Sequence, residues 1–202
     1  MLPDPASRRD EPTDTVEPFT VLTVCTGNIC RSPAVERLLT ARLGPDSGVV
    51  VVSAGTHAVV GHAVSRPMIG LMEEAGARAA GFVARQLTVP EVRHADLILA
   101  LTRKHRSAIV EMQPSAVRRV FTLLELARLA ETVDPGALPD GSPAERLAAL
   151  VPLAAAERGR HRSHHAAQDD VIDPYGRGAT VYAQVFETIL PAVELIAKIA
   201  RR

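Results

Sequence analysis

The stretch that decides the fold lies near the N-terminus and reads Cys25-Thr26-Gly27-Asn28-Ile29-Cys30-Arg31-Ser32. The apolar run 19–24 precedes it and Pro33 follows it, so the sequence predicts a strand, a short loop and a helix. Five residues separate Cys25 from Arg31, enough to direct backbone N–H groups at one anion. The N-terminus of the helix adds positive partial charge at the same point. We therefore expect residues 25–32, the phosphate loop, to bind a phosphate group.

The side chains of the phosphate loop match this chemistry. A loop that stabilises phosphate also stabilises the thiolate of Cys25, and the Ser32 hydroxyl can donate a hydrogen bond to that thiolate. Arg31 offers two parallel N–H donors to two phosphoryl oxygens, which a lysine could not do. Asn28 tolerates the left-handed backbone that a tight loop requires. The alternative is a chance cysteine in a turn between a strand and a helix.

A second stretch, Asp173-Pro174-Tyr175, lies far along the chain in the context 171–176. Taken alone, an Asp-Pro pair indicates an ordinary turn, because proline biases the preceding residue towards extended conformations. Transfer of phosphate from an aryl ester needs a nucleophile, donors to the equatorial oxygens and a proton for the leaving oxygen. Cys25, the phosphate loop with Arg31, and Asp173 would supply these three parts.

Both stretches resemble the low-molecular-weight protein tyrosine phosphatases, whose signature Cys-x-Gly-Asn-x-Cys-Arg-Ser, followed by Pro, is matched without a gap. The resemblance implies that Cys25 is the nucleophile and Asp173 the general acid, with no metal or cofactor. It implies that the phosphate is held by Thr26, Gly27, Asn28, Ile29, Cys30, Arg31 and Ser32.

Further residues bear on how the phosphate loop is supported and on which substrate is chosen. The resemblance implies that Ser53 supports the loop through Asn28, and Phe82 replaces the family's usual histidine three residues before Arg85. It implies phosphotyrosine as substrate, because phosphoarginine-directed relatives carry threonine where this chain has Ile29. Tyr175 would form the opposite wall of the pocket. Many members also have an aromatic residue soon after the Ser-Ala-Gly segment, where this chain reads His57-Ala58-Val59-Val60.

Three other functions remain open. An arsenate reductase or a phosphoarginine phosphatase could use the same fold, although reductases relay electrons through further cysteines and this chain has only two. A phosphoprotein-binding module would keep the phosphate loop and lose the chemistry. For Cys30 two interpretations are equally weighted: a disulfide partner that protects Cys25 after oxidation, and a small buried apolar residue.

Composition indicates an intracellular enzyme. The formal net charge is zero, so nothing favours nucleic acid or a membrane as partner, and the expected partner is a phosphotyrosine-containing protein. Two cysteines within one loop indicate a reducing compartment and no disulfide framework, and we expect a cytoplasmic protein. Residues 1–18 are polar and lack the apolar core of a signal peptide, so they are predicted to be a disordered tail.

The expected fold is an α/β three-layer sandwich with a central four-stranded parallel sheet, because short apolar runs alternate with helical patterns. Residues 19–202 would form one phosphatase domain. The expected strands are 19–25, 48–53, 96–101 and 118–121. The expected helices are 33–43, 66–76, 103–112, 123–131 and 179–200.

The resemblance covers residues 19–131 and 169–200, with an insertion at about 132–168 between them. Residues 144–158 are rich in Ala and Leu and are predicted to be helical. Because the 132–168 segment precedes Asp173, we hypothesise that it shapes the rim of the site or docks a partner. Its histidines, His161, His164 and His165, are expected to be solvated rather than metal ligands.

Overall fold

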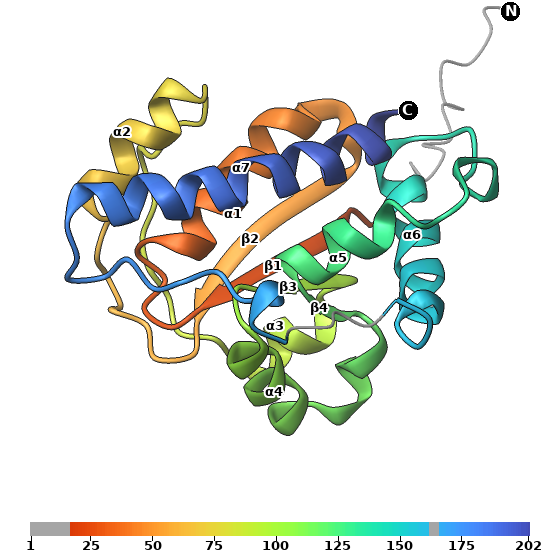
Figure 1. Cartoon of the computed structure of the whole chain (residues 1–202), viewed down its shortest axis with the longest axis horizontal. Helices are drawn as coiled ribbons and strands as arrows, with labels where there is room; N and C mark the ends of the chain where they lie inside the picture. Colours follow the sequence, from red (N-terminus) through yellow and green to blue (C-terminus); the bar gives the residue numbers. More distant parts are fainter. Residues whose placement is uncertain (1–16, 162–165) are drawn as a thin grey trace, which may run out of the picture.

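The computed structural model describes residues 17–161 and 166–202 of the chain. Four strands form one parallel sheet in the order β2-β1-β3-β4, and helices lie on both of its faces (Figure 1). The strands are β1 (Phe19–Cys25), β2 (Val49–Gly55), β3 (Leu97–Ala100) and β4 (Val120–Thr122). The helices are α1 (Arg31–Leu43), α2 (Arg66–Glu74), α3 (Val89–His94), α4 (Arg103–Met112), α5 (Leu123–Ala130), α6 (Pro143–Glu157) and α7 (Ala179–Arg201).

Successive side chains along each strand point to opposite faces of the sheet, so the core has two layers. Val21 and Leu99 face α1, α5 and α7, whereas Leu22 and Ile98 face α3 and α4. All four side chains are fully or almost fully buried, as expected for strands covered on both faces. The predicted three-layer sandwich with a four-stranded parallel sheet is thus confirmed.

The strand register brings three strand ends together. Cys25, the last residue of β1, pairs with Gly55 at the end of β2, and Val24 pairs with Ala100 at the end of β3. A Cβ at Gly55 would lie 2.4 Å from the carbonyl oxygen of Thr26, so only glycine lets the end of β2 approach the phosphate loop so closely. The carboxyl ends of the strands, where ligands bind in open α/β sheets, therefore surround the phosphate loop.

The expected elements are present with shifted ends. Helix α1 begins at Arg31 rather than Pro33, so the phosphate loop closes directly into the first helical turn. Helix α3 was not expected, although Thr88 and Glu91 form a capping box at its start. It has only 6 residues, too few for helical periodicity to reveal it.

The predicted helix at 144–158 is α6. Ser142 and Glu145 form a capping box at its start, and Pro143 occupies the first turn, where proline is tolerated. The helix lies across the amino end of the sheet (Figure 1): Ala144 is next to Gly48, which precedes β2, and Arg158 donates to the carbonyl of Val120 at the start of β4. It is therefore at the opposite end of the strands from the phosphate loop.

Two sequence predictions lie partly or wholly outside the described residues. The predicted tail, residues 1–18, overlaps them only at positions 17 and 18, and His164 and His165 are not among them. Between residues 17 and 161, and from 166 to 202, no helix combines the length and apolar character needed to cross a membrane.

Candidate active site

A pocket of about 210 Å³ opens at the carboxyl ends of the strands. Its lining combines residues of the phosphate loop with the loop that carries Asp173: Cys25, Thr26, Gly27, Ile29, Cys30, Arg31, His57, Val59, Asp173 and Tyr175. Residues 171–176, the acid loop, thus meet the phosphate loop across this pocket. The structure brings together two stretches that lie about 140 residues apart in the chain.

Cys25 is the first member of a chain of hydrogen bonds that continues through Ser32 to Asn28. Its Sγ is 3.0 Å from Ser32 Oγ, which in turn accepts a hydrogen bond from Asn28 Nδ2 at 2.9 Å. Ser32 Oγ keeps its own hydrogen while it accepts from Asn28, so it can donate to the sulfur when Cys25 is a thiolate. This arrangement stabilises negative charge on Cys25 Sγ and on any anion that the sulfur releases.

Asn28 fixes the curvature of the phosphate loop. Its φ of 54° is the only positive value at a non-glycine position among the described residues. Its Nδ2 also donates to Ser53 Oγ at 2.8 Å, and its Oδ1 accepts the backbone N–H of Arg85 at 2.9 Å. These side-chain bonds hold the left-handed residue in place, and Ser53 accepts one of them.

The hydrogen-bond network that runs from Asn28 through Ser53 ends at Glu36, a residue that the sequence did not point to. Ser53 Oγ donates to Glu36 Oε2 at 2.5 Å, and burial raises the pKa of this carboxyl group. Phe82, which replaces the family's histidine, is not part of this network: its ring lies under the guanidinium of Arg37, 5.6 Å from Arg37 Cζ. On the helical pattern of α1, Glu36 is indistinguishable from a surface residue, so no local signal identified it.

Arg31 joins the two loops. The residue is 3% exposed; Nη2 forms an ion pair with Asp173 Oδ2 at 2.7 Å, and Nη1 donates to the carbonyl of Val171 at 3.0 Å. Its Nε is buried without a hydrogen-bond partner in the described part of the chain. A buried donor without an acceptor is costly, and the edge formed by Nε and Nη2 has the geometry to hold two oxygens of an oxyanion.

The acid loop lies over this edge. Asp173 Oδ1 accepts the backbone N–H of Tyr175 at 3.2 Å, which closes the turn around Pro174, and Oδ2 faces Arg31. The Asp173 side chain is 52% exposed, so it can exchange a proton with water. Tyr175 lines the pocket and is largely exposed. The carboxyl group is thus close enough to an anion on Arg31 to exchange a proton with it.

The walls of the pocket are mainly apolar. Ile29 and Val59 lie within reach of Gly27, where an added Cβ would approach each of them to 3.5 Å. His57 lines the mouth, and its Nδ1 is 3.3 Å from Thr56 Oγ1. His57 and Val59 are thus the residues of the 57–60 stretch that line the pocket. Such a wall suits a flat apolar group attached to the bound phosphate.

Cys30 is buried behind the pocket. Its Sγ is 3.2 Å from Ser65 Oγ and 3.6 Å from the hydroxyl of Tyr182, and burial raises the pKa of the thiol. Both cysteines are free. The raised pKa keeps Cys30 protonated at neutral pH, so Cys30 is not a second nucleophile at rest.

His105 is a second residue that the sequence analysis missed. It is buried at the start of α4, with Nε2 2.9 Å from Thr26 Oγ1 and Nδ1 2.9 Å from Thr102 Oγ1. Thr102 Oγ1 also accepts the His105 backbone N–H at 3.2 Å, so both ring nitrogens lie within hydrogen-bond distance of a threonine hydroxyl, which can donate or accept. Burial, with Arg31 nearby, lowers the pKa of His105 to about 4, so the ring is neutral.

Two groups of residues remain outside the pocket. Among the described residues, none that lines the pocket comes from the 132–168 segment, so this part of the chain offers no support for the hypothesis that the segment shapes the rim. Within residues 17–161 and 166–202, no cluster of three or more His, Cys, Asp or Glu side chains could hold a metal ion. His161 instead pairs with Glu157, its Nε2 3.3 Å from Oε2.

Comparison with known proteins agrees with this geometry. The chain is 36% identical over 115 residues to the low molecular weight protein-tyrosine-phosphatase Etp of Escherichia coli K12, covering 57% of this chain and 76% of Etp. The YwlE arginine phosphatase of Geobacillus stearothermophilus has a similar structure, with a TM-score of 0.63 and 26% identity over 90% of this chain and 92% of YwlE.

The Erwinia amylovora tyrosine phosphatase AmsI shares the fold, with a TM-score of 0.64 and 24% identity over 92% of this chain and 95% of that one. The family model of the low molecular weight phosphotyrosine protein phosphatases matches residues 20–140. That match spans β1 to the start of the 132–168 segment and includes the phosphate loop. The chain is therefore an enzyme of the low molecular weight phosphotyrosine protein phosphatase family.

Proposed function

We propose that this enzyme hydrolyses phosphotyrosine in proteins through a cysteinyl-phosphate intermediate. The observation that carries the proposal is one pocket in which Cys25 Sγ faces Ser32, while the buried Nε of Arg31 has no partner in the described part of the chain and Asp173 lies against Nη2. Nucleophile, oxyanion donor and proton donor are the three parts that transfer from an aryl phosphate requires.

In the first step the Cys25 thiolate attacks phosphorus, forming an S–P bond as the bond from phosphorus to the phenolic oxygen breaks. Asp173 gives its proton to that oxygen, so tyrosine leaves neutral. Arg31 and the backbone N–H groups of the phosphate loop stabilise the equatorial oxygens. In the second step Asp173 takes a proton from water, which attacks phosphorus, and the Cys25 thiolate leaves with a hydrogen bond from Ser32.

The walls of the pocket support a phenyl ring on the phosphate. Ile29 and Val59 are apolar, and Tyr175 at the rim can stack on a ring, at about 0.5–1.5 kcal/mol beyond the burial of its surface. Phosphoarginine is the second candidate, because the similar structures include an arginine phosphatase. Its guanidinium group would meet an apolar wall at Ile29, which favours phosphotyrosine.

The experiment is phosphate release from phosphotyrosine, phosphoserine and phosphoarginine peptides by the wild type and by Cys25→Ser, under reducing conditions without added metal. We expect release from phosphotyrosine alone, and none with Cys25→Ser. Preference for phosphoarginine would overturn the substrate assignment and keep the mechanism. Release by Cys25→Ser would overturn the mechanism, and no release at all would favour arsenate reduction or a phosphoprotein-binding module.

We place the enzyme in the cytoplasm, because its two cysteines are free and a reducing compartment keeps them so. Within that compartment, Cys30 is proposed as the partner that captures oxidised Cys25. Mass spectrometry after a peroxide pulse should find a Cys25–Cys30 disulfide that thiols reverse. Irreversible oxidation of Cys25 without this disulfide would leave Cys30 as a packing residue.

A further inference from the structure

The acid loop is attached to the protein at its stem, residues 169–171. Three consecutive residues contact three different elements. Asp169 binds Nη2 of Arg128 on α5 with both carboxylate oxygens, at 3.1 and 3.2 Å. Asp170 Oδ1 accepts the backbone N–H of Arg103 at the start of α4 at 2.6 Å, and Val171 donates to the carbonyl of Leu101 at the end of β3 at 2.9 Å. The stem is therefore fixed in position and direction.

The tip of the acid loop, residues 172–176, has far fewer restraints. Ile172 is 57% exposed and Tyr175 is 66% exposed. In the described part of the chain, the polar contact that joins Asp173 to another element is its ion pair with Arg31, a group that also has to hold the phosphate. The position of Asp173 over the pocket therefore depends on the stem.

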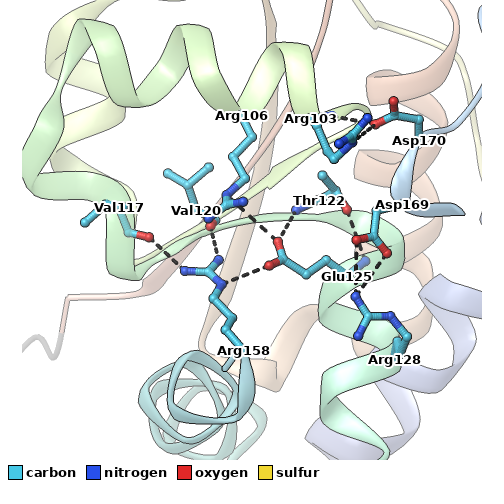
Figure 2. A network of polar contacts seen from close by, with 10 residues as sticks. All are labelled: Arg103, Arg106, Val117, Val120, Thr122, Glu125, Arg128, Arg158, Asp169 and Asp170. Carbon is cyan, nitrogen blue, oxygen red and sulfur yellow. Dashed lines mark hydrogen bonds and ion pairs between the residues drawn. The ribbon is translucent and has the colours of Figure 1, made fainter. Parts of the chain in front are cut away.

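Arg128 also reaches the 132–168 segment. Its Nη1 donates to the carbonyl of His161, while its Nη2 holds Asp169, so one guanidinium binds the chain on both sides of residues 162–168. Figure 2 shows Arg128 and Arg103 on the two carboxylates of the stem, and close by a second cluster around Glu125, which lies on α5 with Arg128. Arg128 thus joins His161, in the 132–168 segment, to Asp169 in the stem.

The second cluster fastens the end of α6 to α5. Arg158 Nε donates to Glu125 Oε1 at 2.9 Å, and the guanidinium lies over the ring of Phe121, with Cζ 3.9 Å from its centroid. Glu125 Oε2 also accepts the backbone N–H of Thr122 at 3.1 Å, so the capping box of α5 and this ion pair share one buried carboxylate. Helix α5 is thereby a rigid support for Arg128 (Figure 2).

We propose that Asp169 and Arg128 are positioning residues for the general acid, and that the 132–168 segment serves catalysis by completing this clamp rather than by lining the pocket. The proposal rests on the proposed function, because it acts through Asp173. Proton transfer requires hydrogen-bond distance. A displacement of about 1 Å at the Asp173 carboxyl group therefore slows proton transfer to the leaving oxygen without abolishing it.

The test compares two aryl phosphates that differ in their need for a proton. Phenyl phosphate releases a basic phenolate and depends on the acid, whereas p-nitrophenyl phosphate releases a stable anion and depends on it little. We expect Arg128→Met to lower kcat/KM, which reports the transfer to Cys25 and not the later hydrolysis, about ten-fold with phenyl phosphate and less than about two-fold with p-nitrophenyl phosphate. Asp169→Asn should do the same, which keeps the test valid if one of the variants fails to fold.

The matched control is Arg160→Met. Arg160 is 77% exposed and pairs with Glu157 at 3.0 Å, so this variant also removes an ion pair near the end of α6 without touching the stem. We expect its kcat/KM to equal that of the wild type with both substrates. The exchanged pair Arg128→Asp with Asp169→Arg should recover part of the kcat/KM for phenyl phosphate, because the ion pair is restored in reverse.

A combination with Asp173→Ala separates positioning from a general structural role. If Arg128 acts through the acid, Arg128→Met should have no further effect on kcat/KM in the Asp173→Ala background. Equal loss with both substrates, or the full ten-fold loss in that background, would overturn the clamp and leave the phosphatase function intact. A wild type without cysteine-dependent hydrolysis would instead overturn the proposed function itself.

Discussion

The phosphate loop is buried and supported by several elements, whereas the tip of the acid loop, across the same pocket, is largely exposed. Asn28 and Ser32 have no exposed surface and are bonded to each other and to β2. Ile172 and Tyr175 are more than half exposed. The difference follows the chemistry: the anion needs fixed donors, and the acid needs access to water and to the entering substrate.

Arg31 belongs to both regions, so its removal should have the largest effect. Arg31→Ala removes the bidentate donor to the phosphate and the donor to the Val171 carbonyl that holds the acid loop. We expect kcat/KM for phosphotyrosine to fall by more than about 10³-fold. Arg31→Lys keeps the charge and loses the paired donors, so it should stay at least about 10²-fold below the wild type. Near-normal activity of the lysine variant in steady-state assays would contradict the bidentate role.

Substitution of Asp173 tests the exposed side of the pocket, the acid loop. Asp173→Ala is expected to lower kcat/KM by about 10²–10⁴-fold with phosphotyrosine and much less with p-nitrophenyl phosphate, because kcat/KM covers the transfer to Cys25 and not the later hydrolysis. Rapid-mixing kinetics should show a slower burst of tyrosine release. A harmless substitution with phosphotyrosine would mean that another group supplies the proton.

Asn28 tests whether the buried region depends on side-chain bonds or on backbone conformation. Asn28→Gly keeps the left-handed φ and loses the bonds to Ser32, Ser53 and Arg85, so kcat should fall about ten-fold. Asn28→Ala loses the same bonds and adds strain of about 1 kcal/mol, visible as a lower Tm than that of the glycine variant. Equal Tm values would show that the backbone is not strained there.

The last prediction concerns stability rather than turnover, through His105 and pH. Its pKa is about 4 in the fold against about 6.5 when unfolded, so the unfolded chain binds more protons between these values. The stabilisation is full above pH 6.5 and is lost as the pH falls towards 4, a change of about 2–3 kcal/mol. In urea titrations from pH 7 to pH 4, His105→Gln should lose less stability than the wild type, and His94→Gln, an exposed control, should behave like the wild type. Parallel curves for all three proteins would contradict the neutral buried ring.

The sequence predicted what lies within one stretch of chain, and the family resemblance paired Asp173 and Ser53 with the phosphate loop, but the other contacts that long-range packing creates were missed. The strand at 19–25, the helix at 144–158 and the residues of the phosphate loop follow from periodicity and motif spacing. Glu36 and His105 sit at helical positions that read as surface residues until β2 and the phosphate loop pack on them. Asp169 was overlooked for the same reason, because an ion pair with Arg128 depends on the path of the whole 132–168 segment.

The ion pair between Arg31 and Asp173 also bears on how the chain folds. The phosphate loop is built from the neighbouring β1 and α1, and such local contacts form early in folding. The Arg31–Val171 bond spans 140 residues, and the acid reaches its place only when the whole sheet and α5 are assembled. We expect a refolding chain to bind phosphate before it can protonate a leaving group, so recovery of turnover should report the last step of folding.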